Sequence, residues 1–307
     1  MTTLDETSPD VTGQGTRPAI VVVGSLHYDI TVDAPDRPRK GETVTGRRWA
    51  PKFGGKGGNQ AAAAQAQGVA TAMVGAVGDD DFGRGLLVGL DRAGVDRAAV
   101  AVLPGTGSGM SVAIFDDGGD YGAVIVSGAN LAIRADQIPD ARLGQARALI
   151  LQNEIPEAVN AAVARRARQL GLVTILNAAP ARPFTTDLPD HVDILVVNAI
   201  EAEMLGGGTV ESLEDAARAA DILATRFGLV VVTAGGDGVA MAGAAADPVA
   251  LPALPITVVS THGAGDMFVG TFAAHLARGD GPEAALHAAN AAAARLVSTP
   301  EHARPSL

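Results

Sequence analysis

The sequence predicts an α/β protein with a mostly parallel central sheet, helices on both faces, and a small additional sheet. From residue 70 onward, apolar runs of strand length alternate with segments of helical periodicity. Strands are expected at 71–77, 149–152, 172–176, 193–197 and 229–233, with helices at 80–93 and from about 157 to 170. Connections of this kind favour parallel neighbours. A chain of 307 residues with 47% hydrophobic content can bury one full core, so one main domain is expected over 19–307.

The composition of the chain disfavours several classes of binding partner. The net charge of −11 disfavours nucleic acid or an anionic membrane, because both bind clustered Lys and Arg. The chain has no cysteine, which excludes disulfides and suits a reducing, cytoplasmic location. No apolar run approaches the ~20 residues that span a bilayer. Residues 1–18 are polar and lack an apolar segment, so we expect a disordered tail rather than a signal peptide.

The first strand is expected at Ala19–Gly24 and is followed by Ser25, Leu26, His27, Tyr28 and Asp29. Ligands of α/β sheets bind at the carboxyl ends of strands, and a dinucleotide site would show G-x-G-x-x-G at this point. That motif is absent. Asp29 could accept hydrogen bonds from a polyol, or it could be a turn residue.

Two segments interrupt the βα alternation. Short strands are expected at 30–33 and 43–49, and a β-hairpin at 110–115 and 121–126. Together, residues of about 30–53 and 109–126 indicate a small sheet that stands off the main body. Such a sheet could cover a ligand as a lid, or it could associate with a second copy through its apolar face.

A glycine-rich segment, Gly54-Gly55-Lys56-Gly57-Gly58-Asn59-Gln60, opens an alanine-rich helix that stops at Gly68. Glycines permit close approach of a ligand to the backbone, and Asn59 offers both a donor and an acceptor to hydroxyls. The Walker pattern G-x-x-x-x-G-K-[ST] is absent. The segment could also be a simple helix entry.

The segment Thr261-His262-Gly263-Ala264-Gly265-Asp266 organises the predicted site. A strand is expected at Ile256–Val259 before it, and a helix from about Gly265 to Gly279 after it. Small residues on a first helical turn leave backbone N–H groups available to an anion. Asp266 could then accept a proton from a hydroxyl during phosphoryl transfer, or it could be an acidic N-cap.

Polar side chains follow several predicted strands: Asp29, Glu154, Asn198, Glu201, Thr233 and Asp266. Each alone could be a cap or a turn. Because the carboxyl ends of parallel strands meet at one edge of the sheet, we expect them to form one site.

These motifs resemble a known family. Gly54–Ala61 and Gly263–Asp266 look like the two signatures of the PfkB carbohydrate kinases, and 41–46, 128–130 and 177–181 resemble its ribokinase branch. The similarity runs from about residue 19 to about 306. It implies a ribokinase-like fold, ATP and Mg²⁺ as cofactors, phosphorylation of a sugar hydroxyl, and a β-sheet lid over the sugar.

The resemblance also implies roles for individual residues. Asp266 matches the catalytic base, and Gly263, Ala264 and Gly265 match the anion hole. Glu201 matches a residue that manages Mg²⁺, through water. The sugar-contacting positions are His27, Asp29, Gly55, Lys56, Asn59 and Glu154. The nucleotide-binding positions are Asn198, Thr233, Gly235, Gly236, Asp237, Gly238, Gly265 and Asn290.

Three features depart from the family pattern. His27 and Tyr28 replace Asn and a small residue, which adds bulk beside the sugar site and predicts an effect on acceptor choice. Ser260 stands where the second signature begins with Asp, a carboxylate that helps to hold a monovalent cation in many relatives. The chain also ends at Leu307 without the final helix expected after Pro305 and Ser306.

The function expected from these features is transfer of the γ-phosphoryl group of ATP to a primary hydroxyl of a pentose, ribose above others. One alternative keeps the chemistry and changes the acceptor to a nucleoside or another sugar, with His27 and Tyr28 stacking on a base. A second is a non-catalytic sugar-binding or regulatory protein on the same fold, against which Asp266 and Glu201 count. No nucleic acid or membrane partner is expected, and a homodimer through the lid sheet is the one protein partner considered.

Overall fold

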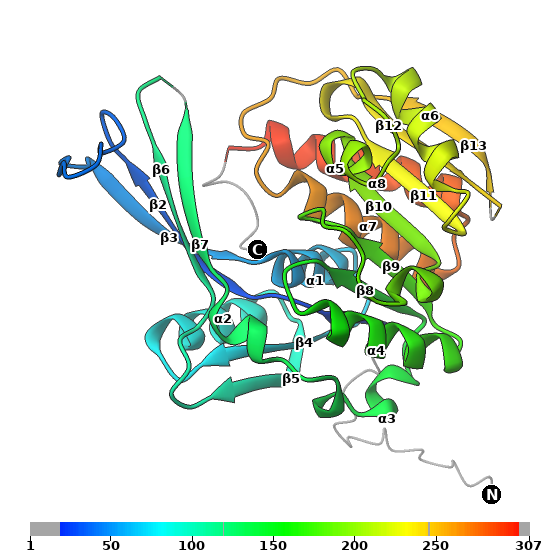
Figure 1. Cartoon of the computed structure of the whole chain (residues 1–307), viewed down its shortest axis with the longest axis horizontal. Helices are drawn as coiled ribbons and strands as arrows, with labels where there is room; N and C mark the ends of the chain where they lie inside the picture. Colours follow the sequence, from blue (N-terminus) through cyan, green and yellow to red (C-terminus); the bar gives the residue numbers. More distant parts are fainter. Residues whose placement is uncertain (1–18, 119, 245, 301–307) are drawn as a thin grey trace, which may run out of the picture.

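The computed structural model describes residues 19–300 except 119 and 245. The tail predicted at 1–18 and the carboxyl-terminal residues 301–307 lie outside that part of the chain. A nine-stranded sheet forms the centre of the molecule, in the order β13-β12-β11-β10-β9-β8-β1-β4-β5 (Figure 1). Strands β5 to β11 of this order run parallel, and β12 and β13 are antiparallel additions at one edge. The predicted α/β class is confirmed.

The strands of the main sheet are β1 (Ile20–Val23), β4 (Thr71–Gly78), β5 (Asp96–Leu103), β8 (Ala148–Gln152), β9 (Val173–Asn177), β10 (Ile194–Asn198), β11 (Leu229–Thr233), β12 (Gly238–Gly243) and β13 (Ala246–Pro252). The helices are α1 (Lys56–Ala66), α2 (Asp81–Arg92), α3 (Asp140–Leu143), α4 (Glu157–Gln169), α5 (Ala199–Met204), α6 (Leu213–Leu223), α7 (Ala264–Arg278) and α8 (Pro282–Ser298). Short 3₁₀ turns are η1 (Gly128–Ala132), η2 (Ala135–Gln137), η3 (Leu188–His191) and η4 (Gly235–Asp237).

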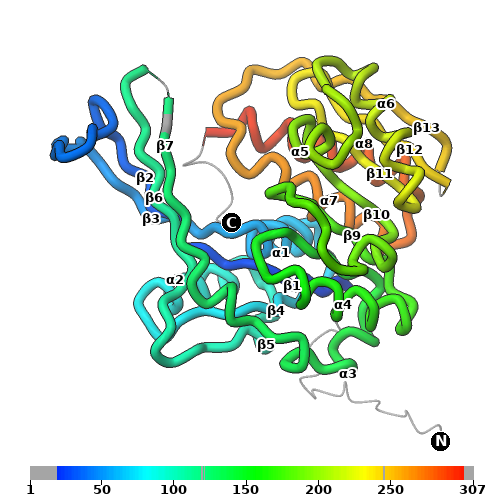
Figure 2. The backbone as a smooth tube through the Cα atoms, viewed as in Figure 1, coloured from blue at the N-terminus to red at the C-terminus, as the bar shows by residue number. Residues whose placement is uncertain are grey.

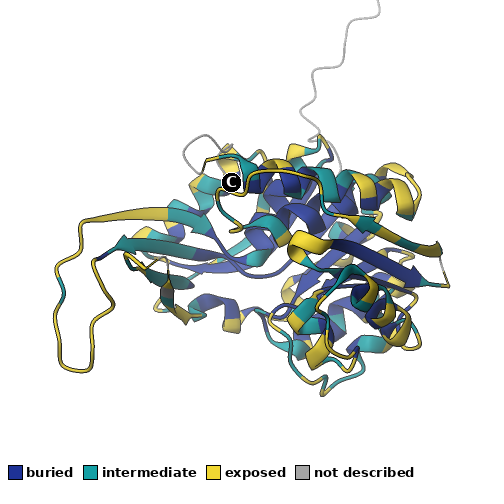
Figure 3. Ribbon diagram, turned by 90° about the horizontal axis from the view of Figure 1, so that it is seen from above, coloured by how far each residue is buried: buried dark blue, intermediate teal, exposed yellow. Residues whose placement is uncertain are grey.

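Two hydrophobic cores sandwich the main sheet. Alternate residues of each strand enter one core or the other, as the period of a strand requires: Val21 and Val23 enter the first, and Ile20 and Val22 the second. The first core packs on α4 and α6, and the second on α1, α2, α7 and α8. In Figure 3 the buried residues accordingly concentrate in the sheet and in the helix sides that face it.

A separate four-stranded sheet stands off the main body, in the order β3-β2-β6-β7. Its strands are β2 (His27–Asp33), β3 (Arg48–Gly54), β6 (Met110–Phe115) and β7 (Tyr121–Val126). The chain passes from β1 at the centre of the main sheet directly into β2, as the tube in Figure 2 shows. The predicted hairpin of β6 and β7 is confirmed at the predicted residues.

Two predicted strands are wrong. The strand expected at 43–49 begins only at Arg48 and continues to Gly54 as β3, an edge strand that includes Pro51. The residues of the strand expected at 256–259 form no strand, and Val258 and Val259 are 56% and 53% exposed. A β-branched run favours a strand only where a neighbouring strand can pair with it. Asp266 therefore follows a loop rather than a strand end.

Tyr28 also differs from its expected place. Its ring stacks on Phe82 of α2 with centroids 4.6 Å apart and planes 8° apart. Successive residues of a strand point to opposite faces, so Tyr28 faces α2 while His27 and Asp29 face the other way. The expectation that Tyr28 adds bulk beside the sugar site is wrong for this reason.

Candidate active site

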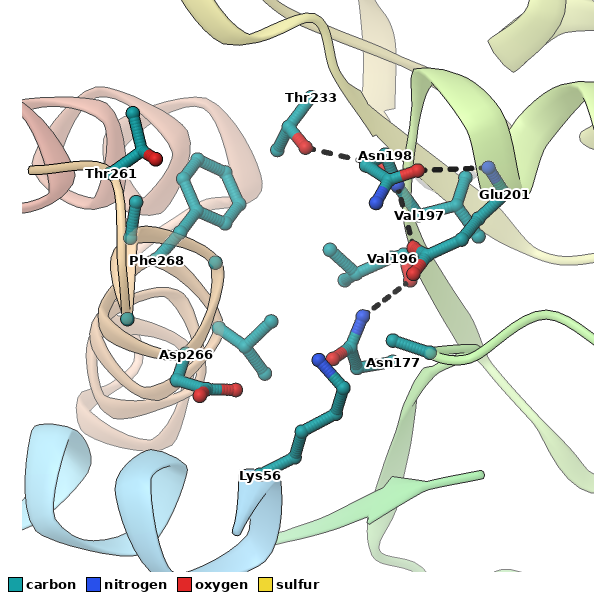
Figure 4. A pocket seen from close by; sticks show the side chains of 15 residues that line it. Lys56, Asn177, Val196, Val197, Asn198, Glu201, Thr233, Thr261, Asp266 and Phe268 are labelled. Atoms are coloured by element: carbon teal, nitrogen blue, oxygen red, sulfur yellow. Dashed lines mark hydrogen bonds between the residues drawn. The ribbon is translucent and has the colours of Figure 1, made fainter. Parts of the chain in front are cut away.

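A pocket opens at the carboxyl ends of the central strands. It is lined by Lys56 of α1, Asn198 and Glu201 at the β10–α5 junction, Thr233 at the end of β11, and the first turn of α7. Figure 4 shows the Lys56 side chain reaching into the pocket between the carboxylates of Asp266 and Glu201. Of the six polar residues predicted to meet at one sheet edge, Asn198, Glu201, Thr233 and Asp266 line this pocket, the last from a helix. Asp29 and Glu154 do not line it. The remaining lining residues are Asn177, Ala179, Val196, Val197, Thr261, Gly263, Ala264, Gly265, Phe268 and Val269.

Asp266 is buried at the bottom of this pocket. Its Oδ2 accepts a hydrogen bond from Asn59 Nδ2 at 3.0 Å, and its Oδ1 accepts one from Gln60 Nε2 at 2.9 Å. Burial raises the pKa of Asp266, while the charge of Lys56 and the two amide donors act in the opposite direction. A carboxylate with a raised pKa is a better proton acceptor than an exposed aspartate.

The first turn of α7 begins at a residue that only glycine fits well. Gly263 is the N-cap and has a φ of 79°, in the left-handed region. The N–H of Ala264 donates to the Thr261 carbonyl at 3.2 Å. Within the described part of the chain, the N–H groups of Gly263, Gly265 and Asp266 have no acceptor. These three, rather than Ala264, are available to an anion at the helix start.

Lys56 carries the positive charge of the pocket. Burial alone would lower its pKa, but Asp266, Glu154 and Glu201 outweigh that effect and raise it. The pKa of Glu201 is raised by burial, against a hydrogen bond from the Asn198 N–H and the charge of Lys56. Asn198 and Glu201 bond reciprocally at the start of α5, at 2.8 and 2.9 Å. This pairing fixes the Glu201 carboxylate where it faces Lys56.

A second polar group lies beside the pocket, at the base of the small sheet. Glu154 Oε2 accepts hydrogen bonds from the Lys56 N–H at 3.0 Å and from the Ser25 hydroxyl, and it lies 3.7 Å from His27 Nδ1. The Ser111 hydroxyl donates to Asp29 Oδ1 at 2.5 Å. Burial raises the pKa of Asp29 and outweighs the effect of this hydrogen bond. Ser25 and Ser111 had no signal in the sequence, because serines are common in loops and strands.

Gly55 joins the two polar groups. Its φ is 85°, and a Cβ there would lie 2.6 Å from the His27 N atom, so only glycine permits this approach. Of the predicted nucleotide residues, Asn198, Thr233 and Gly265 line the pocket, and the others lie at η4, at the start of β12 and on α8. Gly235–Asp237 form η4 after β11, the Ala253 N–H donates to the Asp237 carbonyl at 3.3 Å, and Asn290 Nδ2 donates to the Pro252 carbonyl at 3.2 Å. The end of β13 thus joins η4 to α8.

The described residues contain no cluster of three or more His, Cys, Asp or Glu side chains of the kind that holds a metal alone. Mg²⁺ is commonly bound through one or two carboxylates together with substrate phosphates. Glu201, which faces the pocket beside Lys56, fits that mode of binding. Among the described helices, none is long and apolar enough to cross a membrane.

Comparison with known proteins decides the family. The sequence profile of the pfkB family carbohydrate kinases matches residues 17–306. The chain belongs to the pfkB family. This pfkB kinase is 36% identical over 280 residues to a ribokinase of Bacillus subtilis, with 91% of this chain and 92% of the relative covered. It is 31% identical to a deoxyribokinase of Salmonella typhi, with 87% and 88% covered.

Solved structures agree with the sequence comparison. A ribokinase of Arabidopsis thaliana in complex with ribose and ATP superposes with a TM-score of 0.85 at 31% identity, covering 92% of this chain and 94% of that one. The ribokinase-like fold and the carbohydrate kinase class are thereby confirmed.

Proposed function

We propose that this pfkB kinase transfers the γ-phosphoryl group of ATP to a primary hydroxyl of a pentose, with ribose as the foremost acceptor. The observation that carries the proposal is the position of Asp266, a buried carboxylate on the same helical turn as three N–H groups that have no acceptor among the described residues. Lys56 and Glu201 line the same pocket on the side opposite Asp266. The relatives named ribokinase, and the one solved with ribose and ATP, support this acceptor and donor.

The residues divide the chemistry between them. Asp266 accepts the hydroxyl proton as the sugar oxygen attacks the γ-phosphorus. The N–H groups of the α7 turn stabilise negative charge on the transferring group. Lys56 adds a positive charge, and Glu201 would hold Mg²⁺, which supplies neutralisation of phosphate charge when bound. Thr233, Asn198, the η4 turn and Asn290 would hold the nucleotide.

The acceptor is proposed to lie between Asp266 and the second polar group. Asp29, Asn59, Lys56 and Glu154 offer acceptors and donors suited to sugar hydroxyls. The small sheet carries Asp29 and His27 at its base, so we propose that it acts as the lid over the sugar. A nucleoside acceptor loses support, because Tyr28 stacks on Phe82 and does not face the site.

The small sheet has an apolar edge strand, β7, which pairs with β6 on one side and with no strand of the described chain on the other. Val124, Ile125 and Val126 of β7 are 68%, 60% and 50% exposed, and Trp49 of β3 is 64% exposed. Exposed apolar edge strands favour association with another chain. We propose a homodimer through this sheet. Sedimentation equilibrium of Val124→Asp beside the unchanged protein tests it, since a monomer in both would contradict it.

A coupled assay of ADP release tests the function. Ribose, 2-deoxyribose, hexoses and nucleosides are compared as acceptors at equal concentrations with ATP and Mg²⁺. The proposal expects the highest kcat/KM for ribose or 2-deoxyribose. If none of the acceptors in the panel gives ADP release, a non-catalytic binding protein is favoured instead. The cytoplasmic location remains a prediction from the sequence.

A further inference from the structure

A row of three buried side-chain amides lies behind Asp266, and of these only Asn177 also lines the pocket. Gln60 of α1 and Gln152 at the end of β8 are 0% exposed, and Asn177 at the end of β9 is 8% exposed. The sheet register pairs Gln152 with Asn177, so their side chains leave the sheet on the same face, toward α1. Gln60 and Gln152 do not line the pocket. Their side-chain NH₂ groups donate to other protein groups instead.

Each hydrogen bond in this row has a defined donor and a defined acceptor. Gln60 Nε2 donates to Asp266 Oδ1 at 2.9 Å and to Asn177 Oδ1 at 3.0 Å. Gln152 Nε2 donates to Gln60 Oε1 at 2.8 Å. If the Gln60 amide turned over, its oxygen would face a carboxylate and a carbonyl oxygen, and its NH₂ would face another NH₂. The surrounding groups therefore fix the amide in the orientation that donates to Asp266.

Gln152 is itself held in place at some cost. Its backbone carbonyl accepts a hydrogen bond from Asn160 Nδ2 at 2.8 Å. Its own Oε1 is buried with no partner within the described part of the chain, and it fills the space that a Cβ on Gly24 would occupy, 1.8 Å from that position. A buried acceptor without a partner destabilises a fold.

We propose that Gln60 is a positioning residue for Asp266, locked in orientation by Gln152 and Asn177, and that it fixes the carboxylate's rotation and favours its ionised form. The inference rests on the proposed role of Asp266 as the base. Other charged groups that face Asp266 are Lys56 of α1, Glu154 after β8 and Glu201 of α5. None of these makes a hydrogen bond with Gln60 among the described residues.

The first test replaces Gln60 with methionine, which keeps the length of the side chain and removes both donors. A hydrogen bond to a charged group favours the charged form, so its loss should move the acid limb of kcat/KM upward by about one to two pH units. The loss of turnover should be larger at pH 6 than at pH 9. KM for ribose should stay within about twofold, since Gln60 is fully buried and its amide is hydrogen-bonded to protein side chains.

The matched control is Gln65→Met on the same helix. Gln65 accepts a hydrogen bond from the Thr71 N–H at 2.9 Å and does not contact Asp266. Its replacement should lower thermal stability without moving the pH profile. Gln60→Glu is the second variant, because it keeps an oxygen for Gln152 but sets a carboxyl group against Asp266. It should move the acid limb further upward than Gln60→Met does.

The inference is overturned if the acid limb stays in place in both Gln60 variants, as it does in the control, and any loss of turnover is the same at every pH. The failure of the proposed function gives a different result. In that case the unchanged protein would release no ADP with any acceptor, or Asp266→Asn itself would retain turnover, whatever the Gln60 variants do. Circular dichroism melts of all variants identify loss of folding separately.

Discussion

Gly270 of α7 lies directly against Ala63 of α1. A Cβ on Gly270 would be 2.6 Å from the Ala63 Cβ and 2.6 Å from the Gln60 carbonyl oxygen. Asp266 lies one helical turn before Gly270, and its two amide donors, Asn59 and Gln60, lie one turn before Ala63 and Ala64. The close crossing of these two helices therefore sets the distance between the carboxylate and its donors.

Gly270→Ala should force the two helices apart. Overpacking of a buried contact typically costs about 1–3 kcal/mol, and here part of the shift falls on the Asp266 hydrogen bonds. We expect a lower free energy of unfolding and a lower kcat, measured by urea unfolding and by the coupled assay. Gly107→Ala is the control, because a Cβ there meets nothing within 4 Å. Equal, small effects of both substitutions would contradict this account of the crossing.

Asp266 should cost the fold stability at neutral pH. Burial raises its pKa above the unfolded value, so folding favours the protonated form. The penalty is absent below the unfolded pKa, grows as pH rises through the folded pKa, and is complete above it. Asp266→Asn should therefore raise Tm at pH 7.5, with the gain shrinking as pH falls toward 4.

Asn59 makes this substitution tolerable. Its side-chain amide has no hydrogen bond other than that to Asp266 among the described residues, so this amide can turn over to accept from an asparagine at 266. Differential scanning calorimetry across that pH range is the measurement. A Tm gain that is independent of pH, or a loss at pH 7.5, would show that ionisation of Asp266 is not the source of the cost.

His27 should affect acceptor choice, and Tyr28 should not. His27 is 4% exposed and faces Glu154. His27→Asn should change the ratio of kcat/KM for ribose to that for bulkier acceptors at least about tenfold in favour of ribose, since one pocket feature is worth ~1–3 kcal/mol. Tyr28→Ala removes the stacking on Phe82, so it should lower the free energy of unfolding by about 1–3 kcal/mol and leave the ratio unchanged. A changed acceptor ratio in Tyr28→Ala, with an unchanged ratio in His27→Asn, would contradict the strand geometry.

Turnover should be largely independent of K⁺. Ser260 stands where the pfkB pattern has Asp, and the loss of one charge a few Å from a cation weakens binding by on the order of several kcal/mol. Glu301 could supply a substitute charge, but it lies outside the described residues. Initial rates in potassium and tetramethylammonium salts at equal ionic strength are compared. Strong activation by potassium would refute the prediction and make Glu301 the next residue to replace.

The sequence predicts strands correctly where the local residue pattern agrees with the strand pairing in the structure. The hairpin of β6 and β7 has alternating apolar residues around a turn, and its bounds are those predicted. The run at 256–259 has the same β-branched composition but no neighbouring strand, so it lies exposed in a loop. β5 and β13 were not predicted, since they lie at the two edges of the sheet and are only partly buried. β12 is buried but was not predicted either, because its glycines and alanines are not typical of strands.

The same contrast holds for the site. Lys56, Asn59 and Asp266 belong to short motifs that can be recognised within one segment. Gln152 reaches Gln60 only because β8 pairs with β9 in one register and α1 packs across their ends. Such a network depends on contacts between residues 92 positions apart, which no local pattern reports.

The most direct measurement is kcat of Asp266→Asn in the coupled assay with ribose, ATP and Mg²⁺. The substitution keeps the size of the side chain and removes its ability to accept a proton. Because general-base catalysis typically contributes ~10²–10⁴-fold, kcat should fall by at least about that factor while KM for ribose changes little. Near-normal turnover would show that Asp266 only caps α7, and the proposed mechanism would be wrong.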